Sequence, residues 1–280
     1  MDMRSRFLPQ GWYPESEADC RREIESFGKY FQEAAVEVKT VHGGIVPHAG
    51  WFFSGRLAAL VFHVCAVRFS PEVVVLFGGH LGPGTGIIYN DKAWETPLGA
   101  LDVDLDLAAA LMKKTKVRPE GPRTNDNTIE VQTPLVKYFF PNSRLLAVRV
   151  PHSELAVEIG REVAALSQSQ GKSILAFGST DLTHYGPNYD FQPQGGGAKA
   201  LAWVKEVNDK GFIQRALGLD FQGMLAHAAD SRSACSAGGA VAAAAACGAL
   251  GAAGGTLADY YTSHDIMPGS SFVGYAGIVY

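Results

Sequence analysis

The stretch GGIVPHAGWFFSG, from Gly43 to Gly55, is the best starting point for predicting the fold. A short apolar run ends at Pro47, His48 follows at once, and a helical pattern begins after the aromatic residues Trp51, Phe52 and Phe53. This pattern predicts a buried strand that carries a histidine at its carboxyl end and leads into a helix. In open α/β sheets, ligands bind at this end of the strands.

The same arrangement recurs along the chain. Apolar, strand-like runs lead to three further histidines, in the segments Pro71–His80, Arg144–His152 and Ser173–Gly186, the last of which contains His184. Since the carboxyl ends of parallel neighbours meet at one edge of a sheet, we expect these histidines to converge with the first one. Gathered imidazoles suit a metal site or acid–base chemistry. For any one of them, a hydrogen-bonded loop residue is the alternative.

The strands alternate with segments of helical periodicity. Helices are predicted over residues 16–35, after 55, and over 104–116, 125–141, 153–169, 198–227 and 236–250, with further strands over 86–90, 256–263 and 271–280. This alternation predicts an α/β fold with αβα layers and a mainly parallel central sheet. Since no Pro-, Ser- or Gly-rich linker interrupts the pattern, we expect a single domain over residues 1–280.

Composition limits the classes of function. The chain has 280 residues, of which 47% are hydrophobic, and a formal net charge of −4, which favours neither nucleic acid nor an anionic membrane as partner. The small-residue region 233–255 is too weakly apolar for a membrane span, and we expect a helix packed at the surface there. Four cysteines without CxxC spacing and a start without a signal-peptide core favour a cytoplasmic setting.

Further residues are candidates for the site at the strand ends. Asp181 follows the fourth strand, where capping of the next turn is the alternative. Cys235 stands before the small-residue helix, and a cysteine among Ser, Ala and Gly by itself indicates a buried structural thiol. Glu130 is a candidate third metal ligand or a helix residue bonded to a backbone amide or Arg. Trp51 and its aromatic neighbours line either a pocket or the core.

The motifs together resemble a known family. VPHAGWFFSG, VVVLFGGH, NTIEVQTP, GSTDLTHYG, SACSAGG and SFVGYAGIVY occur in this order, and GWYPESEADC looks like the family's opening motif. They resemble the MEMO family, which in prokaryotes is often called AmmeMemoRadiSam system protein B, over nearly the whole chain. The resemblance implies a fold similar to class III extradiol dioxygenases, which hold non-heme Fe(II) and open catechol rings.

The resemblance also implies roles for single residues. His48 and His80 match metal-binding positions, and Cys235 matches the cysteine that stands where the dioxygenases supply a carboxylate ligand. His184 matches the acid–base position, with Asp181 as its companion. Fe(II) is the metal that the resemblance implies first, and Cu or Zn accept the same imidazole and thiolate donors.

The chain also departs from the family pattern. FGGHL stands where the family usually shows Gly-Pro-Ser-His-His, so Leu81 replaces a histidine. DNTIEVQ stands where Glu-His-Ser-Leu-Glu-Val-Gln is usual, so Asn127 replaces another. His152 and His264 occur where the family pattern has no histidine, and they are candidates for an altered pocket wall.

Three functions follow as expectations. The first is a metal-dependent redox enzyme that acts on a small molecule, with an aromatic diol implied by the resemblance. The second is a non-catalytic metal- or peptide-binding module with a protein partner. The third is a cysteine-dependent hydrolase that uses Cys235, His184 and Asp181.

Overall fold

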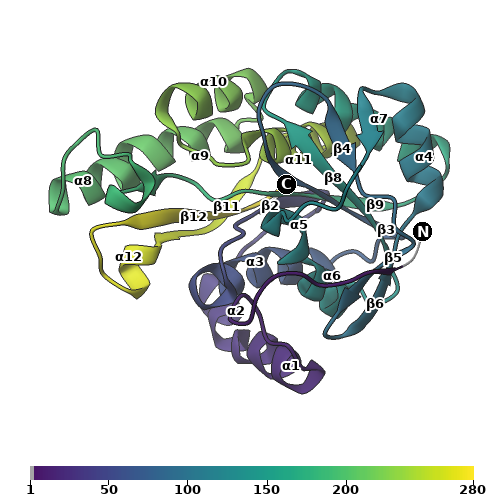
Figure 1. Cartoon of the computed structure of the whole chain (residues 1–280), viewed down its shortest axis with the longest axis horizontal. Helices are drawn as coiled ribbons and strands as arrows, with labels where there is room; N and C mark the ends of the chain where they lie inside the picture. Colours follow the sequence, from purple (N-terminus) through teal and green to yellow (C-terminus); the bar gives the residue numbers. More distant parts are fainter. Residues whose placement is uncertain (1–2) are drawn as a thin grey trace.

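The computed structural model describes residues 3–280 and has three layers, with a sheet between two sets of helices (Figure 1). Within these residues the large sheet has nine strands in the order β10-β12-β2-β9-β3-β8-β4-β7, and β11 pairs with β12 outside this path. Its strands are β2 (Gly43–Val46), β3 (Val73–Leu81), β4 (Gly86–Ile88), β7 (Val117–Pro119), β8 (Arg144–Pro151), β9 (Ile174–Ser179), β10 (His184–Tyr185), β11 (Thr256–Thr262) and β12 (Phe272–Val279).

The centre of the sheet is parallel. β2 pairs parallel with β9, β9 with β3, and β3 with β8, whereas β12 joins β2 antiparallel and β4 joins β8 antiparallel. The predicted α/β class with a mainly parallel central sheet is therefore confirmed.

Alternate residues of the central strands face the two helical layers, because successive side chains of a strand point to opposite faces. In β3, Val73, Val75 and Phe77 pack into one core and Val74 and Leu76 into the other. The first layer contains α4 (Leu105–Lys114), α7 (Leu155–Ser169), α9 (Lys210–Leu217), α10 (Phe221–Ser231) and α11 (Ala237–Leu250). The second contains α1 (Glu17–Ser26), α2 (Gly28–Ala34), α3 (Trp51–Ala66) and α6 (Thr133–Phe139) (Figure 1).

The small-residue helix α11 is buried, and the prediction of a surface-packed helix is wrong. Its residues from Ala237 to Cys247 are all buried between the sheet and α7. A Cβ on Gly239 would lie 2.9 Å from Gly78 Cα, and one on Gly160 of α7 would lie 2.1 Å from the Ala242 carbonyl oxygen. Ala and Gly are needed because the backbones approach so closely. Among residues 3–280 no helix has the length and apolar character that crossing a membrane requires.

Several predicted elements are divided or were missed. The helix predicted over 16–35 breaks at Phe27 into α1 and α2, and the one over 125–141 becomes α5 (Asn127–Glu130) and α6. The helical region 198–227 contains α8 (Ala198–Trp203), a π-helix η2 (Val204–Asp209), α9 and the start of α10. Sequence patterns missed the short elements β1 (Met3–Arg4), β5 (Ala93–Thr96), β6 (Gly99–Asp102), β7, β10, η1 (Pro187–Tyr189) and α12 (Ser263–Ile266). β1, β5 and β6 form a separate small sheet.

Candidate metal centre

The strand order brings two of the predicted histidines to the same edge of the sheet. His48 lies two residues beyond β2, and His80 is the penultimate residue of β3. β9 lies between these strands and is parallel to both. The carboxyl ends of β2, β9 and β3 therefore lie side by side at one edge of the sheet. The imidazoles of His48 and His80 lie on either side of the end of β9.

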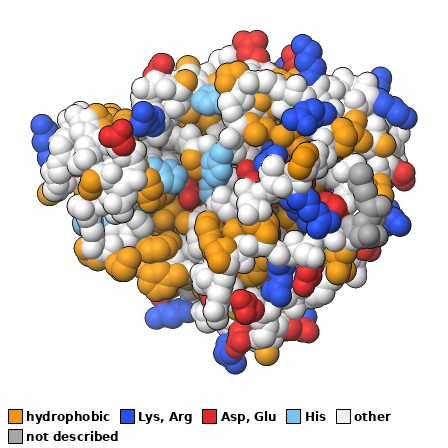
Figure 2. All heavy atoms as spheres, viewed as in Figure 1, with side chains coloured by type: hydrophobic (Ala, Val, Ile, Leu, Met, Phe, Trp, Pro, Cys, Tyr) orange, Lys and Arg blue, Asp and Glu red, His pale blue; other side chains and the backbone are white. Residues whose placement is uncertain are grey.

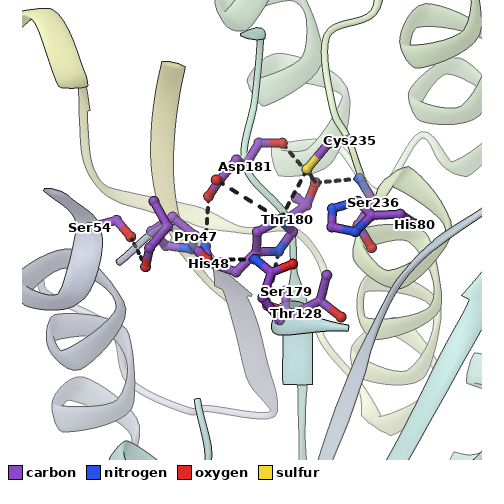
Figure 3. Close-up of polar contacts among 12 residues, drawn as sticks. Pro47, His48, Ser54, His80, Thr128, Ser179, Thr180, Asp181, Cys235 and Ser236 are labelled. Carbon is purple, nitrogen blue, oxygen red and sulfur yellow. Dashed lines mark hydrogen bonds and ion pairs between the residues drawn. The ribbon is translucent and has the colours of Figure 1, made fainter. Parts of the chain in front are cut away.

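The loop before α11 carries Cys235 and places its sulfur near the same strand ends. The backbone N–H of Cys235 donates to the Asp181 carbonyl oxygen at 3.1 Å, and Ser236 N–H donates to Thr180 Oγ1 at 3.1 Å. The Ser236 hydroxyl donates to the carbonyl oxygen of Gly79 at 3.0 Å. These bonds tie the loop to the ends of both β9 and β3 (Figure 3).

Three potential ligand atoms converge there. Cys235 Sγ lies 3.1 Å from His48 Nε2, and the sulfur and one nitrogen of each of His48 and His80 all lie within 4.8 Å of one another. The two imidazole rings are perpendicular, with centroids 5.1 Å apart. Bond lengths of about 2.1–2.3 Å at a tetrahedral ion separate a nitrogen and a sulfur ligand by about 3.6 Å. The donor set thus fits a transition metal after small side-chain movements.

Ser179 and Gln132 hold His48 and its loop in one orientation. Its side chain is 1% exposed, and its Nδ1 lies 3.3 Å from the hydroxyl of Ser179. Gln132 Nε2 donates to the Pro47 carbonyl oxygen at 2.7 Å and to Ser179 Oγ at 3.3 Å. Burial, aided by the neighbouring His80, lowers the pKa of His48 to about 3. The imidazole is therefore neutral, with Nε2 directed at the sulfur.

His80 is more exposed and is flanked by an acidic side chain. Its Nδ1 lies 4.0 Å from Asp126 Oδ2, and its backbone N–H donates to the same oxygen at 3.5 Å. The other oxygen of Asp126 accepts from the N–H of Thr128 at 3.0 Å, and Arg149 Nη1 lies 3.7 Å from Oδ2. Gly79 precedes the ligand with φ +97, and its N–H donates to Thr128 Oγ1 at 2.8 Å. Asp126 thus holds the turn through the backbone of His80 and places a carboxylate oxygen near Nδ1 of the ring.

Asp181 and His184 lie beside the cluster. Asp181 Oδ1 accepts the backbone N–H of His48 at 2.6 Å, so the carboxylate holds the loop of a candidate ligand. Burial raises the pKa of Asp181 and lowers that of His184, and their mutual attraction opposes both shifts. The ring of Tyr189 packs edge-on against His184, with centroids 4.9 Å apart.

A cavity of about 460 Å³ opens above these residues. Figure 2 shows histidine side chains in a hollow of this face, with hydrophobic side chains along its border. Asn127 lines the cavity and donates from Nδ2 to the carbonyl oxygen of His48 at 3.1 Å. The other lining residues are Trp12, His48, Ala49, Gly50, Phe53, His80, Asp181, His184, Asn188, Tyr189, Ser263, Met267, Ser271, Val273 and Tyr275.

Glu130 was predicted as a candidate pocket residue, but it does not line this cavity. Its fully buried carboxylate accepts the N–H groups of Phe7 and Leu8 at 3.0 Å each and the hydroxyl of Tyr13 at 2.9 Å. Glu130 therefore anchors the N-terminal arm. That arm brings Trp12 to the cavity, a role that sequence patterns did not suggest.

Three other predicted pocket residues also lie elsewhere. Trp51 is buried in the core, and its Nε1 donates to the Val131 carbonyl oxygen at 3.1 Å. His152 follows β8, one strand further from β9, and its Nε2 lies 2.9 Å from the Leu225 carbonyl oxygen. His264 lines a different, smaller cavity beside α8. None of these side chains lines the cavity above the cluster.

Sequence reasoning missed the residues that support the histidines. The candidate ligands or their loops are contacted by Asp126, Ser179 and Gln132. Each of these three residues lies next to or within a motif that was identified for another residue. The spacing of Asp126 and Thr128 at the start of a helix is a capping signal, and it was available in the sequence.

Comparison with known proteins assigns the family. A family model described as Memo-like protein matches residues 8–279. A MEMO1 family protein of Methanopyrus kandleri is 34% identical over 250 residues, which cover 86% of this chain and 83% of that protein. A MEMO1 family protein of Methanosarcina acetivorans is 31% identical over 285 residues, which cover 100% of this chain and 99% of that protein.

A solved structure shows the same fold at low sequence identity. The crystal structure of an uncharacterized protein from Escherichia coli K12 matches with a TM-score of 0.51 and 12% identity, over 79% of this chain and 91% of the other. The chain belongs to the Memo-like protein family.

Proposed function

We propose that this chain binds a transition metal through His48, His80 and Cys235 and acts as a non-heme metal-dependent redox enzyme. The observation that carries the proposal is the convergence of two imidazole nitrogens and one sulfur within 4.8 Å of one another, where both histidines also line a cavity. The family's resemblance in fold to class III extradiol dioxygenases supports a redox role and makes Fe(II) the first metal to test.

The donor set suits this chemistry. Neutral imidazoles and a thiolate bind Fe, Cu and Zn, and three protein ligands leave coordination positions open. When bound, the metal would supply Lewis-acid or one-electron chemistry to an oxygen-containing substrate. The ring-opening reaction of the dioxygenases takes up both atoms of dioxygen and needs no other reductant, so the substrate and oxygen balance the product.

The surrounding residues have separate roles in this proposal. His184 lines the cavity as a neutral imidazole and accepts a proton from a substrate hydroxyl group. Asp181 stabilises the imidazolium that results and keeps the His48 loop in place through its 2.6 Å hydrogen bond. Trp12 and Phe53 line the cavity and restrict water around the substrate.

Electrostatics favour a metal site over a cysteine hydrolase. Desolvation raises the pKa of the Cys235 thiol, and it lowers that of its neighbour His48 to about 3. Cys235 is then a neutral thiol beside a neutral imidazole, and a neutral thiol is a poor nucleophile. With a cation held nearby, the thiolate form of Cys235 would be favoured, and the same sulfur and imidazole would be good ligands.

The test is metal content after anaerobic purification, measured by mass spectrometry. Near-stoichiometric iron is expected in the wild type and loss of the metal in a His48→Ala/His80→Ala variant. His264→Ala serves as a control, because this histidine lies outside the cavity. Absence of any transition metal from a wild type reconstituted with Fe(II), Cu or Zn would refute the proposal.

A second variant separates an enzyme from a binding module. His184→Ala is expected to keep the metal and to lose oxygen uptake with aromatic diols. If the variant turns over as fast as the wild type, His184 has no acid–base role. If neither protein consumes oxygen with any diol while both hold metal, the redox proposal fails and metal binding stands.

A further inference from the structure

The cavity above the cluster has an unusual combination of lining groups. Aromatic side chains reach it from the N-terminal arm, α3, η1 and β12, namely Trp12, Phe53, Tyr189 and Tyr275. Apart from Asp181 and the histidines His48, His80 and His184, the polar side chains among them are neutral amides and hydroxyls, namely Asn127, Asn188, Ser263 and Ser271. Flat aromatic walls with a few neutral hydrogen-bonding groups favour a flat, largely apolar ligand.

Cationic side chains are missing from this lining. Among residues 3–280, the side chains that line the cavity include neither Lys nor Arg, and Asp181 is the acidic one. The basic residues of nearby elements are engaged elsewhere. Arg149 lies 3.7 Å from Asp126 and is 6% exposed, and Lys205 contacts Asp265 at 2.6 Å.

The absence of cations sets a charge preference. A carboxylate or phosphate that enters a cavity loses its hydration, and proteins offset this loss with Arg or Lys. Away from the two candidate ligand histidines, an anionic substituent would face aromatic rings, neutral amides and hydroxyls, the imidazole of His184 and the carboxyl group of Asp181, with no Lys or Arg side chain among the lining residues to pair with it. A metal ion at the floor would bind the hydroxyl groups of the ligand, so a charge on the opposite side of the ring would remain unpaired.

We infer that the cavity accepts uncharged hydroxylated aromatic molecules and rejects those that carry a carboxylate or phosphate. This inference rests on the proposed metal site and names its ligand class. The chain would then act on a neutral ring compound.

The test compares two ligands of matched shape, 3,4-dihydroxybenzamide and 3,4-dihydroxybenzoate, because the amide is neutral and the acid is ionised at about pH 7. Binding to the metal-loaded protein is measured by calorimetry without oxygen. The amide is expected to bind at least about tenfold more tightly, from the cost of an unpaired charge. Equal or tighter binding of the benzoate overturns the inference, and so does a failure of both to bind.

A charge added to the cavity rim gives a second test. Met267 lines the cavity and is 58% exposed, so Met267→Arg is expected to fold and to bring the two affinities together. Val67→Arg adds the same charge at a position 61% exposed beyond the end of α3 and is expected to leave the ratio unchanged. Equal changes in both variants would overturn the inference.

Metal content is measured on every sample. Absence of metal defeats the proposed function itself. Bound metal with an undiminished affinity for the benzoate defeats the charge preference and leaves the metal site standing.

Discussion

Asp126 shows how much of the candidate centre depends on one side chain. One oxygen caps α5 through Thr128, and the other faces the backbone and ring of His80. Arg149 lies beside the second oxygen and packs over the tyrosine ring of Tyr89 at 5.8 Å. Partners of this kind orient a metal-bound histidine and select the ring nitrogen that binds.

Asp126→Asn is expected to weaken metal binding by about 10- to 100-fold, because the capping oxygen is kept while an amide replaces the oxygen that faces His80. Metal affinity is measured by competition with a chelator. Asp220→Asn is the matched control, since Asp220 also caps a helix, α10, and lies outside the cavity. Wild-type affinity in Asp126→Asn would show that Asp126 does not position the ligand.

At the scale of elements, α11 determines how closely the site can be assembled. The helix lies against the ends of β3 and β9, where Gly239 lets it approach the backbone of Gly78 and Gly178 leaves room for its backbone. A Cβ on Gly178 would lie 2.7 Å from Ala240 Cα. The close packing allows the loop before α11 to hold its cysteine above the strand ends. Larger residues would move the sulfur away from both histidines.

Two substitutions in the same helix are expected to act in opposite directions. Gly239→Ala places a methyl group 2.9 Å from Gly78 Cα and should lower the free energy of unfolding by about 1–3 kcal/mol. At Gly248 the nearest atom is 3.6 Å away, so Gly248→Ala should raise it by up to about 1 kcal/mol through helix propensity. Denaturant unfolding of both variants measures the difference. The packing argument fails if Gly239→Ala is as stable as Gly248→Ala.

At the scale of the whole molecule, a buried carboxylate joins three distant segments. Asp209, at the end of the π-helix η2, accepts the N–H of Thr183 at 3.0 Å and the hydroxyl of Tyr260 in β11 at 2.7 Å. Asn208 Nδ2 donates to Thr183 Oγ1 at 2.8 Å. This network supports the segment that carries His184. Burial raises the pKa of Asp209 to about 7, against the opposing effect of its hydrogen bonds.

The stability should therefore depend on pH through Asp209. The unfolded carboxyl loses its proton near pH 3.8, whereas the folded one keeps it until about pH 7. The folded state thus binds more protons in this window, and the contribution of Asp209 to stability falls as pH rises from about 4 to about 7. The total loss is a few kcal/mol at most, because one pKa unit corresponds to about 1.4 kcal/mol.

Asp209→Asn mimics the protonated form and is expected to lack this contribution. Unfolding free energies of the wild type and the variant are compared from pH 4 to pH 8. The unfolding free energy of the wild type minus that of the variant should fall as the pH rises through this range. Because the histidines titrate in both proteins, their effect cancels in this difference and that of Asp209 remains. A constant difference would mean that Asp209 is ionised throughout.

The sequence by itself determined the alternation of strands and helices, the parallel centre of the sheet and the position of histidines at strand ends. These features follow from local periodicity and from residue types that are adjacent in the chain. The family resemblance added Cys235, which lies 187 residues from His48 in the chain and 3.1 Å from it in space. Spacing alone offers no signal for such a pair.

Only the tertiary structure decided which strand-end residues meet. His80 joins the cluster and His152 does not, because β3 is next to β9 and β8 is one strand further away. Glu130 faces the N-terminal arm rather than the cavity, through contacts to residues more than a hundred positions away. Burial, strand order and long-range hydrogen bonds are properties of the folded chain, and local patterns contain too little information to specify them.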